Sequence, residues 1–239
     1  MSANQPPRPQ KPADRIIAAL DVPDVDRARA LVEKTRHVVS FYKIGMQLQF
    51  AGGLDFAGDL VEQNLKVFLD VKLLDIDNTV EKGVENIAAM GVTFATIHAY
   101  PNAMRAAVRG RGAAPLGLLA VTVLTSMDDA DLKAAGYGGT AEDLVEQRAI
   151  DAEAAGMTGI VCSAREVGRL RNVLRPETLL VTPGIRPAGS DLGDQRRVMS
   201  PGDAVRAGSD YLVIGRPIAA AADPGAAAEA IAAEIAAAG

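Results

Sequence analysis

Two lysines and two aspartates in this chain have the spacing of a charged catalytic site. Asp70 and Lys72 are two residues apart in a strand-like segment, so their side chains point to the same face. Lys43 ends the neighbouring strand-like segment, and Asp75 begins the loop after Lys72. Because nearby carboxylates favour the cation, Lys72 is expected to stay protonated. An ammonium group in a dry site can neutralise a developing carbanion and then deliver its proton.

A structural interpretation of the same charges is a buried ion-pair network that sets the register of the strands. For Asp70 and Lys72 alone, that interpretation is the favoured one. The larger array favours a function, because burying several charges is costly and seldom improves stability over apolar packing. The ends of the strand-like segments carry, in order, Asp21, Lys43, Asp70, Lys72, His98, Thr125, Arg186 and Gly215-Arg216.

A second group of residues, towards the C-terminus, has the features of a phosphate site. Gly215 lets backbone N–H groups approach an anion closely, and Arg216 adds a positive charge where a short helix begins. An ordinary strand-to-helix turn is the alternative. The long loop between Pro183 and residue 200 predicts a lid in which Arg186 and Gln195 close over a bound phosphate. A surface loop without that role is the competing interpretation.

The elements that must position these side chains alternate regularly along the chain. Segments such as residues 24–36, 79–90, 141–155 and 201–207 predict helices, several with Asp, Thr or Ser caps. Short apolar segments between them predict parallel strands at residues 15–21, 41–45, 66–72, 93–99, 117–125, 159–164, 179–184 and 211–215. This order predicts a single-domain (β/α)8 TIM barrel over residues 15–239, closed by an alanine-rich helix at 224–238. A doubly wound open sheet is disfavoured because no Gly-x-Gly-x-x-Gly follows the first strand.

The composition argues against several classes of function. A net charge of −5 over 239 residues does not favour binding to nucleic acid or to an anionic membrane. Cys162 is the single cysteine, which excludes an internal disulfide and favours a reducing, cytoplasmic location. Two histidines and one cysteine make no convincing zinc site, and no apolar run has the length of a membrane span. Residues 1–14 are rich in proline and polar residues and predict a disordered tail.

Seven motifs occur in order between Arg15 and about Arg216: Ala-Leu-Asp21, Tyr-Lys43-Ile-Gly45, Asp70-x-Lys72-x-x-Asp75-Ile-x-Asn-Thr79, Val-Thr-Val-Leu-Thr125-Ser126, Pro183-Gly-Ile-Arg186, Asp194-Gln195 and Ile-Gly215-Arg216-Pro. Together these motifs resemble the orotidine 5′-monophosphate decarboxylase family of the bacterial type. The Asp-x-Lys-x-x-Asp motif alone is shared with a wider superfamily that includes sugar-phosphate decarboxylases and hexulose-phosphate synthases. The Thr-Ser pair and the loop Arg and Gln make the resemblance specific.

The resemblance implies cofactor-free decarboxylation of orotidine 5′-monophosphate (OMP) to UMP and carbon dioxide, the last step of de novo pyrimidine synthesis. Lys72 would donate the proton to C6 of the pyrimidine, and Lys43, Asp70 and Asp75 would complete a charged tetrad. Asp70 would lie near the carboxylate of the substrate. The protein would act as a homodimer in which Asp75 and Thr79 enter the site of the other subunit.

The resemblance also implies which residues contact the rest of the substrate. Asp21 and Lys43 would bind hydroxyl groups of the ribose. Thr125 and Ser126 would lie beside the pyrimidine. The phosphate would be held or covered by Arg186, Gln195, Gly215 and Arg216.

The chain departs from the family pattern in two places. Asp77 stands where the family usually has Pro, and Tyr-Pro-Asn follows His98-Ala where a Gly pair is common. His98 is interpreted as a structural histidine. Two other functions remain open on the sequence alone. One is a metal-dependent sugar-phosphate decarboxylase or aldolase, which needs a further carboxylate near the second strand. The other is a catalytically silent sensor of pyrimidine nucleotides.

Overall fold

Eight parallel strands pair in sequence order, and the eighth pairs with the first to close a barrel. The structure, a computed structural model, describes residues 8–187 and 199–238. The predicted (β/α)8 TIM barrel is confirmed, and the open-sheet alternative is wrong. The strands are β1 (Ile16–Ala19), β2 (Phe41–Ile44), β3 (Lys66–Leu73), β4 (Phe94–His98), β5 (Gly117–Val121), β6 (Gly159–Val161), β7 (Leu179–Thr182) and β8 (Tyr211–Ile214).

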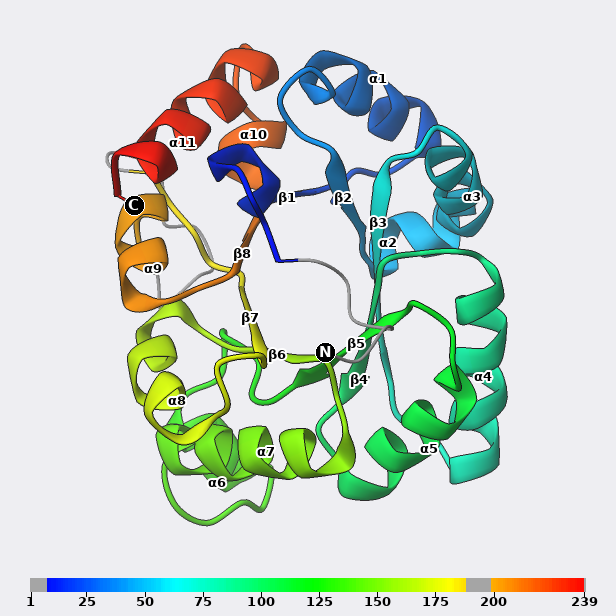
Figure 1. Cartoon of the computed structure of the whole chain (residues 1–239), viewed down its shortest axis with the longest axis vertical. Helices are drawn as coiled ribbons and strands as arrows, with labels where there is room; N and C mark the ends of the chain where they lie inside the picture. Colours follow the sequence, from blue (N-terminus) through cyan, green and yellow to red (C-terminus); the bar gives the residue numbers. More distant parts are fainter. Residues whose placement is uncertain (1–7, 188–198, 239) are drawn as a thin grey trace.

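Helices form a ring around these strands, as Figure 1 shows. Side chains cap the N-termini of three predicted helices: Asp24 accepts from Arg27 N, Thr140 from Asp143 N and Ser200 from Asp203 N. Within the described ranges, no helix has both the length and the apolar character needed to cross a bilayer. The α-helices are α1 (Val25–Thr35), α2 (Met46–Leu48), α3 (Leu54–Glu62), α4 (Asp77–Ala89), α5 (Pro101–Arg111), α6 (Asp129–Ala134), α7 (Ala141–Ala155), α8 (Val167–Val173), α9 (Pro201–Ala207), α10 (Arg216–Ala219) and α11 (Pro224–Ala238). Short 3-10 turns are η1 (Pro12–Arg15) and η3 (Ala164–Glu166), and η2 (Gln49–Gly53) is a π-helical turn.

Several strands end earlier than the apolar pattern predicts. β1, β5 and β6 stop at Ala19, Val121 and Val161, whereas the predicted strands continue to residues 21, 125 and 164. Residues beyond these ends, such as Val123 and Cys162, are still buried, although they no longer belong to a strand. Burial in the loops at the barrel mouth therefore extends the apolar pattern beyond the strand itself.

The barrel has two hydrophobic cores, one between strands and helices and one inside the strands. Aromatic rings fill the inner core: Phe94 lies 5.2 Å from Phe41, 5.4 Å from Tyr211 and 6.1 Å from Phe68, measured between ring centroids. Side chains two residues further along each strand point to the same inner face. The charged residues at the barrel mouth therefore stand on an apolar floor.

The segment before β1 is ordered where it is described. Residues 1–14 were expected to form a disordered tail; of these, residues 12–14 begin the turn η1. Residues 1–7 lie outside the described part of the chain. The turn contacts β1, β8 and α11 (Figure 1), so packing against the barrel holds this short polar segment.

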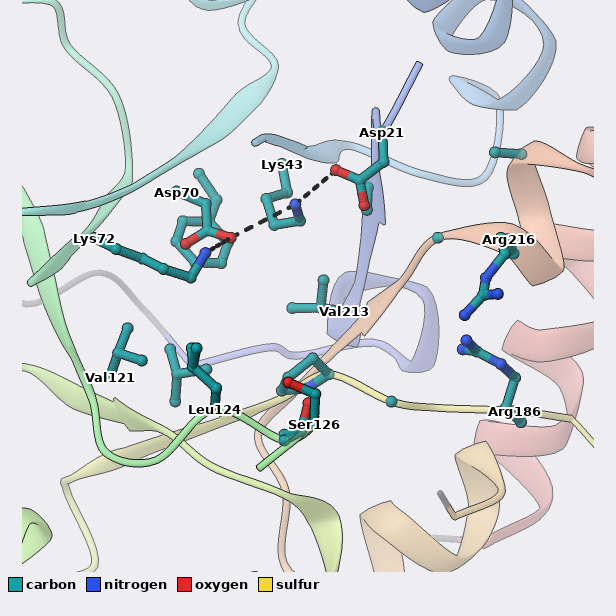
Figure 2. A pocket seen from close by; sticks show the side chains of 18 of the residues that line it. Asp21, Lys43, Asp70, Lys72, Val121, Leu124, Ser126, Arg186, Val213 and Arg216 are labelled. Carbon is teal, nitrogen blue, oxygen red and sulfur yellow. Dashed lines mark hydrogen bonds and ion pairs between the residues drawn. The ribbon is translucent and has the colours of Figure 1, made fainter. Parts of the chain in front are cut away.

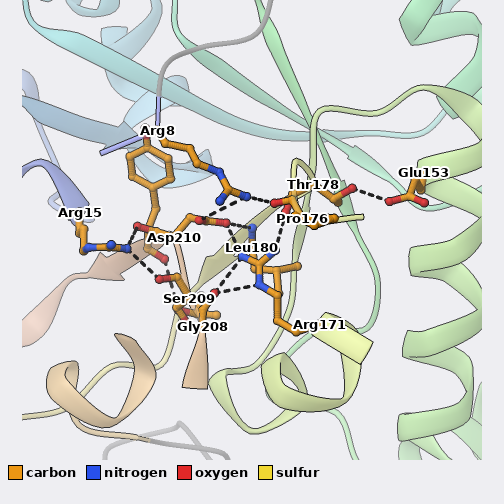
Figure 3. Close-up of polar contacts among 12 residues, drawn as sticks. Arg8, Arg15, Glu153, Arg171, Pro176, Thr178, Leu180, Gly208, Ser209 and Asp210 are labelled. Carbon is orange, nitrogen blue, oxygen red and sulfur yellow. Dashed lines mark hydrogen bonds and ion pairs between the residues drawn. The ribbon is translucent and has the colours of Figure 1, made fainter. Parts of the chain in front are cut away.

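A buried carboxylate, Asp210, ties the same segment to the barrel just before β8, and its contacts are drawn in Figure 3. Asp210 is 6% exposed, and its Oδ2 accepts from Leu180 N at 2.8 Å and from Arg171 Nη2 at 2.5 Å. Arg15 donates to the backbone oxygen of Asp210 at 3.2 Å, and Arg8 lies 3.8 Å from its Oδ1. Buried carboxylates are stable only when paired and hydrogen-bonded, and this one has both kinds of partner.

Candidate active site

A cavity of about 540 Å³ opens at the C-terminal ends of the strands, where barrels of this type carry their sites. Its floor is apolar and includes Ala19, Phe68, Val121 and Val213. Most of the predicted site residues line this cavity, and they are Asp21, Lys43, Asp70, Lys72, Thr125, Ser126, Arg186, Gly215 and Arg216.

Four charged side chains form one continuous array on the cavity wall (Figure 2). Lys43 Nζ lies 2.9 Å from Asp21 Oδ1 and 3.6 Å from Asp70 Oδ2. Lys72 Nζ lies 2.9 Å from the same Asp70 oxygen. The side chain of Asp21 is 53% exposed, whereas those of Lys43 and Asp70 are 9% and 13% exposed. The charges therefore alternate in sign along the array, and its two middle members, Lys43 and Asp70, are the most shielded from solvent.

The carboxyl group of Asp70 is held in its ionised form by this array. Burial acts to raise the pKa of Asp70, but the charges of Lys43 and Lys72 and hydrogen bonds from Lys72 and Thr96 outweigh it. The pKa of Asp70 therefore lies below its ordinary value. The ionised carboxylate in turn keeps both ammonium groups in place around it.

Lys72 is presented by an irregular end of β3. Asp70 and Lys72 both line the cavity, as predicted, and Val71 packs against the outer core. The backbone of Lys72 has a φ of 50°, in the left-handed region that non-glycine residues seldom adopt. The register between β3 and β4 also shifts between Leu69 and Leu73. The two side chains thus share a side even though the strand is irregular between them.

Asp75 and Thr79 lie apart from the cavity of their own chain. Both residues are exposed, on the loop after β3 and in the first turn of α4. Oδ1 of Asp75 accepts from Ile76 N at 2.6 Å. Among the described residues, the charged array within one chain is thus completed by Asp21, whose carboxylate pairs with Lys43.

The opposite end of the cavity is positively charged. The side chains of Arg186 and Arg216 point towards each other there, away from Lys72 (Figure 2). Gly215 is the residue before α10, and Arg216 is the first residue of that helix. Arg186 N donates to Met199 O at 3.0 Å, which brings together the two ends of the predicted lid loop. Gln195 and most of that loop lie outside the described residues.

Three residues that support the array were missed as site residues. A Cβ atom on Gly45 would lie 2.9 Å from both Lys43 Nζ and Asp21 Oδ1, so glycine leaves room for this ion pair. Gln49 Nε2 donates to Ile44 O at 3.0 Å and to Asp70 O at 3.1 Å, and so joins the ends of β2 and β3. Thr96 donates to Asp70. Its inward position in β4, next to the charged strand β3, was the signal available in the sequence.

The described residues do not include a group of three or more His, Cys, Asp or Glu side chains placed to hold a metal ion. The two carboxylates of the array, Asp21 and Asp70, are instead bridged by the ammonium group of Lys43. The positive charge between them is thus supplied by the chain itself.

Comparisons with known proteins identify the family of this chain. The sequence profile of the "Orotidine 5'-phosphate decarboxylase / HUMPS family" matches residues 14–231. An orotidine 5'-phosphate decarboxylase of Methylobacterium radiotolerans is 58% identical over 225 residues, which cover 94% of this chain and 97% of that protein. One of Rhodopseudomonas palustris is 57% identical, covering 93% and 95%. The crystal structure of the Lactobacillus acidophilus orotidine 5'-phosphate decarboxylase superposes with a TM-score of 0.83 at 36% identity, covering 96% of this chain and 99% of that one. The chain therefore belongs to the orotidine 5'-phosphate decarboxylase / HUMPS family.

Proposed function

We propose that this protein decarboxylates OMP to UMP and carbon dioxide, in de novo pyrimidine biosynthesis, without a cofactor. The observation that carries the proposal is the ion pair of Lys72 and Asp70, at 2.9 Å, on the wall of a cavity that has two arginines at its other end. A nucleotide monophosphate has a phosphate for the arginines and a base for the charged array. The 58% identity to a named decarboxylase supports the same substrate.

In the proposed reaction, the bond between C6 and the carboxylate carbon breaks, and its electron pair stays on C6. The ring does not readily delocalise that pair, so the protein must stabilise it electrostatically. The Lys72 ammonium group supplies the positive charge and then transfers a proton from Nζ to C6. Lys72 is left as a neutral amine and regains a proton from water, which reaches its side chain because it is 30% exposed.

The other predicted site residues are proposed to orient the substrate. Asp21 and Lys43, which already share an ion pair, bind the ribose hydroxyls. Thr125 and Ser126 lie beside the pyrimidine, on the loop after β5 that lines the cavity. The phosphate is bound by Arg186, Gln195, Gly215 and Arg216. Binding energy from this non-reacting group then contributes to closing and ordering the site.

The protein is proposed to act as a homodimer in which Asp75 and Thr79 complete the partner subunit's site. Their exposure outside the cavity of their own chain supports this assignment. Large apolar side chains are exposed on the segments after β2 and β3: Phe50 at 87%, Ile76 at 73% and Met46 at 58%. Exposed apolar surface of this kind favours an interface. The cytoplasmic location expected from the single cysteine remains a prediction.

The proposed function is tested with the purified protein, OMP and EDTA, by following the loss of ultraviolet absorbance of the substrate. Turnover that persists in EDTA is the expected result. Turnover that EDTA abolishes would favour a metal-dependent enzyme of the wider superfamily. Binding of UMP without any turnover would favour a nucleotide sensor. Either of these two results would overturn the proposal.

A further inference from the structure

The bulge that presents Lys72 stands opposite a single residue of the next strand. In the ladder between β3 and β4, Leu69 is paired with Ala95, and the next pair is Leu73 with Ile97. Three residues of β3, Asp70 to Lys72, therefore face one residue of β4, which is Thr96. A bulge leaves backbone groups of the longer strand without ladder partners, and these groups must find other ones.

The hydroxyl group of Thr96 supplies the missing partner. Its side chain is fully buried, and its Oγ1 accepts from Lys72 N at 2.9 Å. The same hydroxyl donates to Asp70 Oδ1 at 2.9 Å. The direction of both bonds follows from chemistry, because a backbone N–H only donates and an ionised carboxylate only accepts.

These two bonds divide the roles of the two oxygens of Asp70. Oδ1 is occupied by Thr96, while Oδ2 lies 2.9 Å from Lys72 Nζ and 3.6 Å from Lys43 Nζ. The carboxylate cannot rotate without breaking the bond to Thr96. One hydroxyl therefore sets both the orientation of the carboxylate and the backbone from which the ammonium group of Lys72 extends.

We propose that Thr96 is a positioning residue for the reaction, acting through Asp70 and Lys72 without touching the substrate. The inference rests on the proposed function, in which Lys72 must meet C6 of the pyrimidine. A hydroxyl is required at this position, since valine has nearly the same shape but would leave the N–H of Lys72 without its acceptor and Oδ1 of Asp70 without its donor. Serine keeps both hydrogen bonds.

The test compares Thr96→Val with Thr96→Ser, using kcat and KM for OMP and the thermal unfolding midpoint. Thr96→Ser is expected to keep kcat within about threefold of the unchanged protein, and Thr96→Val to lower kcat by about 30-fold, because small misplacements of reacting groups are costly. KM is expected to change less than about threefold in both variants, because the phosphate contacts stay intact. If Thr96→Val does not fold, Thr96→Ala takes its place with the same expectation.

Thr35→Val is the matched control, because Thr35 is equally buried but lies in α1 and bonds to Leu31 O and Tyr42 Oη. It is expected to lower the unfolding midpoint and to leave kcat unchanged. An undiminished kcat in Thr96→Val would overturn the inference. So would an equal loss in Thr96→Ser and Thr96→Val, because the methyl group or the packing would then be what matters.

A second measurement does not depend on turnover. The hydrogen bond from Thr96 lowers the pKa of Asp70, so its loss in Thr96→Val is expected to raise that pKa, as followed by carbon NMR of the carboxyl group. Thr96→Ser is expected to titrate like the unchanged protein. Identical titrations in all three proteins would contradict the inference even if OMP proved not to be the substrate. A protein inert towards OMP with the expected titrations would instead contradict only the proposed function.

Discussion

The ammonium nitrogen of Lys72 lies 2.9 Å from Oδ2 of Asp70, and the two side chains differ in their contact with water. Asp70 is 13% exposed, whereas Lys72 is 30% exposed. In the proposed reaction, a shielded carboxylate holds the ammonium group in position, while access to water lets Lys72 recover a proton after giving one up. The asymmetry of this pair suits an acid that must act once in every turnover.

Replacing Lys72 by alanine is expected to lower the rate of OMP decarboxylation at least about 1,000-fold, because both the electrostatic stabilisation and the proton donor are lost. The fold is expected to persist, since Asp70 keeps Lys43 as an ionic partner. Turnover and the circular dichroism spectrum measure the two effects. Lys82→Ala, which removes an exposed lysine paired with Glu85, is the control and should keep full activity. Near-normal turnover in Lys72→Ala would show that another group donates the proton.

Arg216→Ala is expected to lower kcat/KM for OMP by about 10- to 100-fold, the usual effect of losing a hydrogen bond to a charged group. Orotidine, which has no phosphate, is expected to react equally slowly with the variant and the unchanged protein. Steady-state rates with both substrates give the comparison. A similar loss with orotidine would mean that Arg216 acts on the reacting end of the substrate.

Two inactive variants are expected to restore activity when their subunits exchange. In a mixed dimer of Lys72→Ala and Asp75→Asn, one of the two sites has an intact Lys72 and an intact Asp75 from its partner. Random exchange of equal amounts of the two variants makes half of the dimers mixed, and each mixed dimer has one intact site out of two. The mixture is therefore expected to recover about a quarter of the normal activity. Activity is measured after mixing and again after brief partial denaturation to promote exchange. If the mixture stays inactive although mixed dimers form, Asp75 does not serve the partner's site.

His98 is expected to make the folded protein less stable in mildly acidic solution. Burial and the nearby charges of Lys72 and Arg148 lower the pKa of His98, although Asp70 opposes them. Because the folded-state pKa is below 6.5, the unfolded chain binds the proton first, and the free energy of unfolding falls as the pH drops below about 6.5. The loss stops growing once the pH is below the folded-state pKa.

The measurement is the unfolding midpoint between pH 7.5 and pH 5, in the unchanged protein and in His98→Gln. The variant is expected to lose less stability over this range, because it has no imidazole to protonate. His37→Gln is the control, since His37 is 53% exposed and pairs with Glu229 at the surface. Equal pH dependence in His98→Gln and the unchanged protein would contradict this role of His98.

Arg171→Met is expected to lower the free energy of unfolding by roughly 3 kcal/mol, because it leaves the buried carboxylate of Asp210 without its nearest cation. The site at the other end of the barrel should keep its activity in the folded variant. Chemical denaturation measures the change. Arg206→Met, which removes an exposed arginine paired with Asp203, is the control and should change stability by less than about 0.5 kcal/mol. Equal losses of stability in both variants would mean that the other hydrogen bonds of the Asp210 carboxylate stabilise it without Arg171.

The barrel and most of its site could be predicted from the sequence because they depend on local patterns. Apolar strand-like segments alternating with capped helices are properties of short stretches of chain, and they led to the closed barrel of β1 to β8. A two-residue spacing is also local, so Asp70 and Lys72 were correctly placed on one side. Strand ends were less certain, because buried loop residues such as Val123 continue the apolar pattern.

Only the tertiary structure decided which of these residues meet. Asp21 becomes the partner of Lys43, and Arg186 comes to face Arg216, because the barrel closes and brings distant strand ends together. The left-handed backbone of Lys72 is hydrogen-bonded to a hydroxyl of the next strand, at Thr96. Such contacts join segments far apart in the chain, so their geometry follows from the register and closure of the whole sheet. No local pattern of residue types contains that information.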